Sequence, residues 1–192
     1  MRGKGKAMAQ SIAIEEVIAH NKDFVDKGKA SLFPADKRPR KHMAVVTCMD
    51  TRLVGMLSEA LGLVAGDANI IKVAGAQVDG LYGSVMRSLL VAVYELGVTD
   101  ILVVAHTDCG AQHMSFPGMS SQMEQAGIDE AAFTDAAIRG IDLAAWLKGF
   151  GDTEASIRKS VGLIKGHPFI PATVSVQGFI IDTQTGQLQQ VE

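Results

Sequence analysis

The sequence predicts an α/β fold: a mainly parallel sheet of about four strands flanked by helices, preceded by an N-terminal helical arm. Short continuous apolar runs at 43–47 and 101–105 are bounded by polar residues, which is typical of strands buried on both faces. Segments with apolar residues at helical spacing, 51–61 and 84–96, lie between such runs, and each ends at a glycine. Strands that alternate with helices favour parallel pairing with right-handed crossovers.

The remaining elements of the first half follow in order. Residues 1–8 combine glycine and lysine without apolar periodicity, so we expect a disordered or vector-derived tail before a single domain over 9–192. Apolar residues recur at roughly helical spacing over 9–29, which predicts the helical arm. The apolar run 69–74 predicts another strand of the sheet.

The C-terminal half is predicted to continue the alternation. Residues 112–128 are rich in Met, Gln and Ser, which indicates loop and short helix. Two further helices are expected over 131–150 and 153–166, and a last buried strand over 173–181. After a turn at 182–186, the polar tail allows a short fifth strand at the sheet edge.

Composition excludes several classes of function. The chain has 192 residues, 47% hydrophobic and 20% charged, with a net charge of -3, so it lacks the basic surface of a nucleic-acid-binding protein. No apolar stretch approaches the roughly 20 residues that cross a membrane. Two cysteines in a chain of this kind favour a metal or catalytic site over a disulfide, and we expect a cytoplasmic protein.

Chemistry-bearing residues follow two of the predicted strands. Cys48 ends the run 43–47, and His106 ends the run 101–105, with Cys109 three residues further on. Because the carboxyl ends of parallel strands face the ligand crevice, these side chains are expected to meet. Two thiolates and one imidazole with an open fourth position suit catalytic Zn²⁺. A buried pair of thiols that act as small hydrophobic groups is the alternative.

Two further residues stand beside the first cysteine. Asp50 is close enough in sequence to Cys48 to reach a metal or its water, and Arg52 can hold that carboxylate by a bidentate salt bridge. If Arg52 holds Asp50 away, zinc keeps a water whose pKa falls from about 15.7 toward about 7. If Asp50 binds the metal as a fourth ligand, the site is closed. A simple surface ion pair is the alternative.

Other polar residues near these motifs have simpler interpretations. Asp108 is interpreted as a cap of the turn that follows it, and a catalytic role is the less favoured alternative. His113 is a candidate proton shuttle, because histidine is the side chain that most often transfers protons in proteins, although an exposed loop position is favoured. His20, His42 and His167 are interpreted as structural or surface residues. Three apolar residues follow His113 in the same segment: Met114, Phe116 and Met119. They are equally plausible as the lining of an apolar substrate pocket, as part of the core or as dimer contacts.

The two motifs carry a resemblance. Cys-Met-Asp-Thr-Arg at 48–52 and His-Thr-Asp-Cys-Gly at 106–110 resemble the β-class carbonic anhydrases, particularly the short archaeal and bacterial forms. The similarity extends over roughly residues 41–182. It implies that Cys48, His106 and Cys109 bind zinc, and that Asp50 and Arg52 form a dyad that gates the fourth position.

The resemblance also implies an activity and an assembly. The reaction is reversible hydration of CO2 to bicarbonate and a proton by attack of zinc-bound hydroxide. Family members are dimers or multiples of dimers in which the N-terminal helix lies across the partner, which would account for the apolar stripe over 9–29. Neither a nucleic acid nor a membrane is an expected partner.

Two other functions stay open at this point. A hydrolase of COS or CS2 would use the same zinc site, because these molecules are also linear, apolar and attacked at carbon. A non-catalytic zinc or thiol protein would keep Asp50 permanently on the metal. The pair of Asp50 with Arg52 argues against this second alternative, since a structural site needs no arginine to draw the fourth ligand away.

Overall fold

The protein is described by a computed structural model that covers residues 3–33 and 36–191. The chain divides into two compact units, residues 1–36 and residues 37–192. The second unit carries the sheet and all the residues to which the sequence assigns chemistry.

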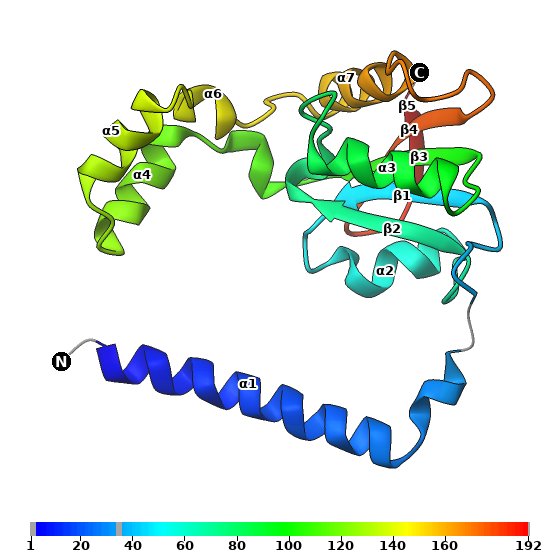
Figure 1. Cartoon of the computed structure of the whole chain (residues 1–192), viewed down its shortest axis with the longest axis horizontal. Helices are drawn as coiled ribbons and strands as arrows, with labels where there is room; N and C mark the ends of the chain where they lie inside the picture. The colour runs from blue at the N-terminus through cyan, green and yellow to red at the C-terminus, as the bar shows by residue number, and fades with distance from the viewer. Residues whose placement is uncertain (1–2, 34–35, 192) are drawn as a thin grey trace. The chain divides into compact units, whose positions relative to one another are not determined.

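The sheet has five strands in the order β2-β1-β3-β4-β5. Their bounds are Met43–Cys48 (β1), Ala68–Val73 (β2), Asp100–His106 (β3), Ser175–Ile181 (β4) and Leu188–Val191 (β5). The first four pair in parallel, and β5 runs antiparallel to β4 (Figure 1). The predicted α/β class, with four parallel strands and a short fifth at the edge, is confirmed.

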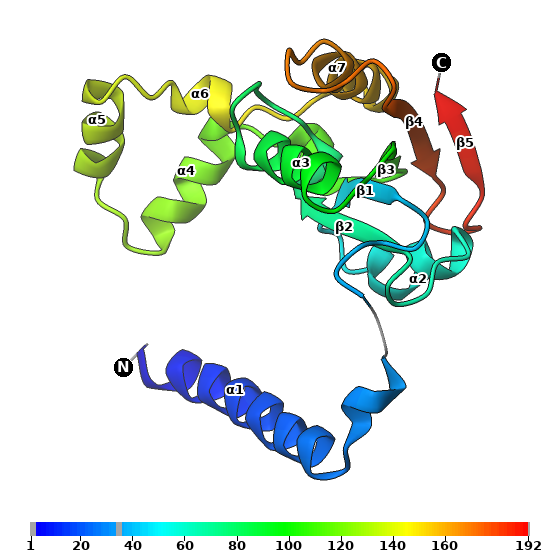
Figure 2. The same ribbon diagram turned by 45° about the vertical axis from the view of Figure 1, so that its right-hand side comes forward.

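Helices cover both faces of this sheet. The helices described in the second unit are α2 (Leu53–Ala60), α3 (Ser84–Tyr94), α4 (Phe116–Gln125), α5 (Glu130–Ile138), α6 (Leu143–Trp146) and α7 (Thr153–Lys165), of which α2, α3 and α7 pack against the sheet. Short 3-10 turns are η2 (Ala74–Ala76) and η3 (Gly110–His113). Helices α3 and α7 lie on one face and α2 on the other (Figures 1 and 2).

Alternation along the buried strands separates the core into two layers. Val46 and Val103 pack with α3 and α7, whereas Val45 and Val104 pack with α2. Helix α7 lies very close to β4: a side chain at Gly178 would collide with Ile157 of α7. A glycine at this position therefore allows the close helix-to-strand packing.

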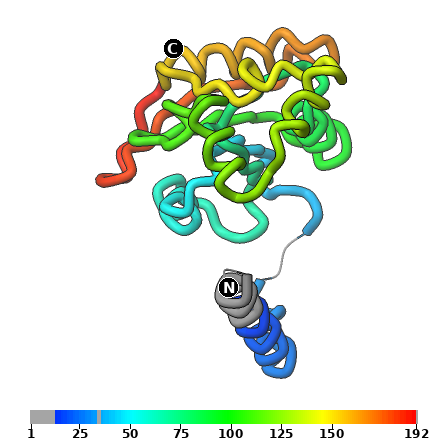
Figure 3. The backbone as a smooth tube through the Cα atoms, turned by 90° about the vertical axis from the view of Figure 1, so that its left-hand side faces the viewer, coloured from blue at the N-terminus to red at the C-terminus, as the bar shows by residue number. Residues whose placement is uncertain are grey.

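The prediction of a single helix over 131–150 is wrong. The structure has two helices, α5 and α6, and the chain between them passes through Gly140 in the left-handed region at φ +79°. Glycine adopts this conformation without steric strain, and Asp142 then caps α6 by accepting a hydrogen bond from Ala145 N. Helices α4, α5 and α6 lie to one side of the sheet, which faces the viewer in Figure 3.

The N-terminal unit contains the predicted helical arm. Helix α1 spans Gly3–Asp26 and is followed by the 3-10 turn η1, Lys29–Leu32. The backbone is thus helical from residue 3, within the segment 1–8 for which we expected a tail, while residues 1 and 2 lie outside the described residues. Lysine, alanine and methionine in this segment are good helix formers, which accounts for the longer helix.

The arm also belongs to its own unit, whereas the sequence assigns residues 9–36 to the domain of the sheet. Within this unit Phe24 packs on Phe33, with ring centroids 6.1 Å apart, but the apolar side chains of Ile14, Val17 and Ile18 are exposed. Among the described residues, no helix is both long and apolar enough to cross a membrane.

Candidate metal centre

The candidate site is built at the carboxyl ends of two neighbouring strands. Cys48 is the last residue of β1 and His106 the last residue of β3, and these strands pair in parallel with Thr47 opposite Val104. The chain then turns through Asp108 in the left-handed region at φ +53°, which returns Cys109 toward Cys48. Parallel pairing therefore brings together three residues that lie up to 61 positions apart.

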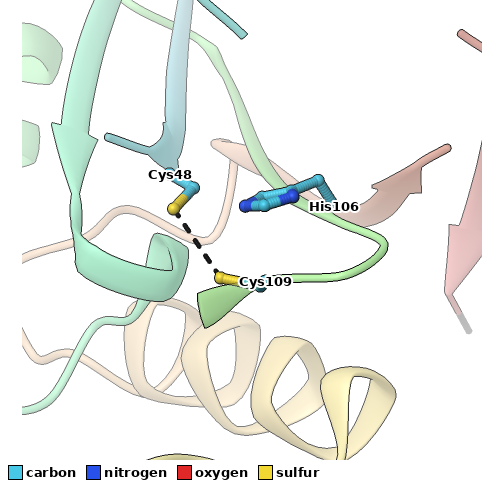
Figure 4. Close-up of side chains that lie close together, drawn as sticks. All are labelled: Cys48, His106 and Cys109. Atoms are coloured by element: carbon cyan, nitrogen blue, oxygen red, sulfur yellow. Dashed lines mark hydrogen bonds between the residues drawn. The ribbon is translucent and has the colours of Figure 1, made fainter. Parts of the chain in front are cut away.

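The three side chains form a close and buried group. Their ligand atoms all lie within 4.8 Å of one another, and the two sulfurs are 3.8 Å apart. Figure 4 shows the sulfurs of Cys48 and Cys109 facing each other, with the imidazole ring of His106 directed toward them. Cys48, His106 and Cys109 are each at most 5% exposed. The geometry therefore offers one sulfur, one nitrogen and a second sulfur to a single ion.

One nitrogen of His106 is left for such an ion. His106 Nδ1 lies 2.8 Å from the carbonyl oxygen of Thr107. A carbonyl only accepts hydrogen bonds, so Nδ1 carries the proton and Nε2 presents a lone pair. The Nε2 atom is buried and has no hydrogen-bond partner among the described residues. Burial of an unpaired polar atom is unfavourable, and a metal ion would satisfy it.

The backbone that orients this histidine is itself held on two sides. Thr107 N donates to Ile181 O at 3.1 Å, which continues the β3–β4 ladder past His106. The Thr107 hydroxyl accepts from Thr183 N at 3.0 Å. These bonds fix the carbonyl that selects the tautomer of His106, which is the usual arrangement around a metal-binding histidine.

The thiols indicate the same donor chemistry. Burial raises the pKa of the Cys109 thiol, and the neighbouring Cys48 raises it further. Two thiolates at 3.8 Å in an apolar cluster with Leu53 and Leu57 would repel each other without a cation between them. Soft sulfur donors with imidazole suit zinc better than magnesium or calcium. The residues present thus fit a zinc ion.

Asp50 lies beside the group and is held by Arg52. Its Oδ1 accepts from the Arg52 backbone N at 2.9 Å, a local turn that the sequence spacing favours. Arg52 Nε donates to the same oxygen at 3.0 Å, and Nη2 donates to Oδ2 at 2.9 Å. Asp50 Oδ2 is 3.8 Å from His106 Nε2. The carboxylate therefore faces the metal-binding group while both of its oxygens are bonded to arginine.

These bonds keep both groups ionised. The hydrogen bonds from Arg52 hold the pKa of Asp50 well below its usual range, against the opposing effect of burial. The pKa of Arg52 is raised by Asp50 first and then by Asp108. Near neutral pH, Asp50 is thus a carboxylate that can only accept hydrogen bonds.

Asp108 also bonds Arg52, a contact that the sequence analysis did not predict. Its carboxylate accepts from Arg52 Nη1 at 3.0 Å, and its carbonyl oxygen accepts from Arg52 Nη2 at 2.8 Å. The interpretation of Asp108 as a turn cap is therefore wrong: in the described part of the chain its carboxylate bonds an arginine 56 positions away. The sequence offered one indication of this contact. A guanidinium has five N–H donors and the predicted pair with Asp50 uses only two, so a second acceptor could be expected.

The other candidate residues do not join the group. His113 is exposed at the end of η3, and His20 and His42 are exposed as well. His167 is buried and structural: its Nδ1 accepts from Phe169 N at 3.1 Å, and its Nε2 bonds to Leu81 O. Phe116 packs edge-on against Phe133 of α5, with ring centroids 5.6 Å apart, which places it in the α4–α6 group.

Comparison with known proteins identifies the family. A family model described as "Carbonic anhydrase" matches residues 43–188. A protein named putative carbonic anhydrase YvdA from Bacillus subtilis is 39% identical, over 96% of this chain and 93% of its own length. The crystal structure of β-carbonic anhydrase isoform I from Trichomonas vaginalis matches with a TM-score of 0.84 and 33% identity, over 93% of this chain and 96% of that one. This chain belongs to the β-class carbonic anhydrase family.

A second kind of relative is more distant. A protein named carbon disulfide hydrolase from Saccharolobus solfataricus is 26% identical over 92% of this β-class chain and 88% of its own length. These two relatives are named for different activities, so membership of the family does not by itself determine the substrate.

The geometry predicts that zinc retention depends on each sulfur. Cys109→Ser should reduce bound zinc from about one ion per chain to a small fraction of it after dialysis, because the variant leaves two strong protein donors. Zinc is measured by elemental analysis of purified protein, with far-ultraviolet circular dichroism as the control for folding. A folded Cys109→Ser protein that keeps a full complement of zinc would contradict this ligand set.

Proposed function

We propose that this chain is a zinc-dependent carbonic anhydrase that interconverts CO2 and bicarbonate. The observation that carries the proposal is the buried group of Cys48, His106 and Cys109, with Asp50 held beside it by Arg52. Three protein donors with a carboxylate kept at a distance match a catalytic site, since a structural zinc site normally has four protein ligands.

Each residue has a part in this chemistry. When bound, zinc supplies a Lewis acid that lowers the pKa of a water toward neutrality. Cys48, His106 and Cys109 would hold the ion. Asp50 accepts a hydrogen bond and thereby orients the attacking water, which its ionised state permits near neutral pH. Arg52 keeps the Asp50 carboxylate from taking the fourth position on the metal.

The surroundings of the site suit a small apolar substrate. Cys48 and Cys109 belong to a cluster with Val45, Leu53 and Val104, and the half-buried Phe150 packs against it. This packed cluster keeps bulk water from the side of the site that faces the core, which strengthens the electrostatic interactions there. CO2 is linear and carries no charge, so it enters this environment without losing a strong hydration shell.

Hydrolysis of CS2 or COS is the alternative that the more distant relatives support. Both molecules are also linear and apolar, and the same donor set would serve them. A non-catalytic zinc protein is less consistent with the geometry, because the hydrogen bonds from Arg52 to both oxygens of Asp50 oppose movement of the carboxylate onto the metal.

The proposal predicts measurable CO2 hydration by stopped flow with zinc-quantified protein. The rate should rise from about pH 6 to about pH 9, because hydration uses deprotonated water as its nucleophile. Removal of zinc with a chelator should abolish the rate, and zinc should restore it.

Sulfide release from CS2 and from COS is measured on the same preparation. No CO2 hydration at any pH together with sulfide release would replace the proposed substrate. Inactivity toward all three molecules at full zinc occupancy would support the non-catalytic alternative.

The dyad has its own test. Arg52→Ala should keep zinc and lower CO2 hydration about 10- to 100-fold, the range for loss of an outer partner of a metal site, because Asp50 becomes free to bind the metal. The matched control is Arg139→Ala on α5, which removes an exposed arginine bonded to Asp135 at 2.7 Å. Equal activity of the two variants would remove Arg52 from the mechanism.

We also propose a homodimer, or a multiple of dimers, located in the cytoplasm. Val17 and Ile18 of α1 are 69% and 64% exposed, and Ile14 and Val25 continue the same face of the helix. A stripe of this kind on a single helix is typical of a surface that a partner covers. The two cysteines are free thiols, which agrees with a reducing compartment.

Ile18→Asp should therefore lower the molar mass in solution toward the 20.3 kDa of one chain, because it places a charge in the proposed interface. Ala19→Asp is the matched control, since it adds the same charge at the next position, away from the stripe formed by Ile14, Val17 and Ile18. Light scattering coupled to size-exclusion chromatography gives the mass. A monomeric wild-type protein, or an Ile18→Asp variant as large as the wild type, would contradict the proposal.

A further inference from the structure

We propose that Asp108 is a positioning residue: it holds the guanidinium of Arg52 in the orientation from which Arg52 keeps Asp50 off the metal. The inference rests on the proposed function, because it assigns a role toward the fourth metal position. In this proposal Asp50, Arg52 and Asp108 form a row of three charged groups, with Asp108 at the end away from the metal-binding group.

The hydrogen bonds of Arg52 carry the first step. Its Nε and Nη2 donate to the two oxygens of Asp50, at 3.0 and 2.9 Å. Its Nη1 donates to the carboxylate of Asp108 at 3.0 Å, and Nη2 also donates to the carbonyl oxygen of Asp108 at 2.8 Å. All three guanidinium nitrogens are used, and the planar group lies between the two aspartates. Movement of Arg52 away from Asp50 would break the bonds to Asp108 as well.

The exposure of these groups explains why a second anchor matters. The Arg52 side chain is 42% exposed, and it follows the strand end as the residue before α2. A long side chain in this position has many rotamers available, and a single exposed ion pair holds it weakly. The Asp108 side chain is 87% exposed, so its pair with Arg52 adds little to stability by itself. Its effect is on the orientation of Arg52.

The place of Asp108 in the chain links this anchor to the metal-binding group. Asp108 lies between Thr107, whose carbonyl orients His106, and Cys109. Its backbone adopts φ +53°, which an aspartate tolerates better than most residues. The bond from Arg52 to the Asp108 carbonyl therefore ties the start of α2 to the turn that positions two of the donors.

The variants follow from this geometry. Asp108→Gly removes the carboxylate, keeps the backbone carbonyl and fits the left-handed conformation without strain. Asp108→Asn keeps the conformation and an acceptor oxygen but loses the charge. Asp135→Asn is the matched control, because it neutralises another exposed aspartate bonded to an arginine, at 2.7 Å, on α5.

The readout besides activity is the affinity of the cobalt-substituted protein for azide, measured from the visible absorption spectrum. If Asp50 competes for the fourth position, azide binds more weakly. We expect Asp108→Gly to bind one metal per chain like the wild type, to bind azide roughly two- to fivefold more weakly and to hydrate CO2 more slowly by a similar factor, the range for one exposed ion pair. Asp108→Asn should lie between the two proteins, and Asp135→Asn should match the wild type.

A double-variant cycle separates action through Arg52 from any other effect. If Asp108 acts through Arg52, adding Asp108→Gly to Arg52→Ala should leave azide affinity at the value of Arg52→Ala alone. Independent, multiplicative losses would overturn the proposal, and so would unchanged azide affinity in Asp108→Gly.

If Asp108→Gly fails to fold or to bind cobalt, Asp108→Asn decides by the same criterion. Wild-type protein that binds azide but does not hydrate CO2 would count against the proposed function alone, because the azide comparison does not depend on that activity.

Discussion

The parallel pairing of β1 with β3 is the constraint on which the site depends. Cys48 and His106 end neighbouring strands, so the hydrogen bonds of the ladder set the separation of the first two donors before any side chain is placed. The layers under α2 and under α3 and α7 bury both faces of these strands and keep the register. The third donor, Cys109, comes from a short turn that begins where β3 ends.

This arrangement leaves polar atoms in an unfavourable environment. Nε2 of His106 is buried without a hydrogen-bond partner in the part of the chain that the structure describes, and burial raises the pKa of Cys109. The unpaired nitrogen disfavours folding of the metal-free chain, and a bound cation would relieve it by accepting the lone pair and would favour the thiolate form of both cysteines. Asp50 does not provide this relief, because its carboxylate is hydrogen-bonded to Arg52 and lies 3.8 Å from His106 Nε2. The bonds from Arg52 thus leave the relief of these groups to a metal ion, and they keep the Asp50 carboxylate available to orient the attacking water in the proposed reaction.

Most of the fold could be predicted, because its signals are local. Buried strands appear as continuous apolar runs, and the helices between them end at glycines, so the order and the parallel pairing follow. The prediction failed over 131–150, where apolar periodicity continued through Gly140 although the backbone reverses there at φ +79°. The boundary of the sheet domain also lay beyond local signals, since periodicity over 9–29 indicates a helix but not the surface on which it packs.

The site shows where such reasoning ends. Cys48, His106, Cys109 and the pair of Asp50 with Arg52 could be proposed from the sequence, because each lies within a few residues of a strand end. The partnership of Asp108 with Arg52 could not, because a turn residue followed by polar backbone favours a local cap, and nothing local indicates an arginine 56 positions away. An arginine that bonds a carboxylate with only two of its five donors can bond a second acceptor with the rest. Counting those donors, once the fold places two strand ends side by side, leads from the dyad to a third charged residue.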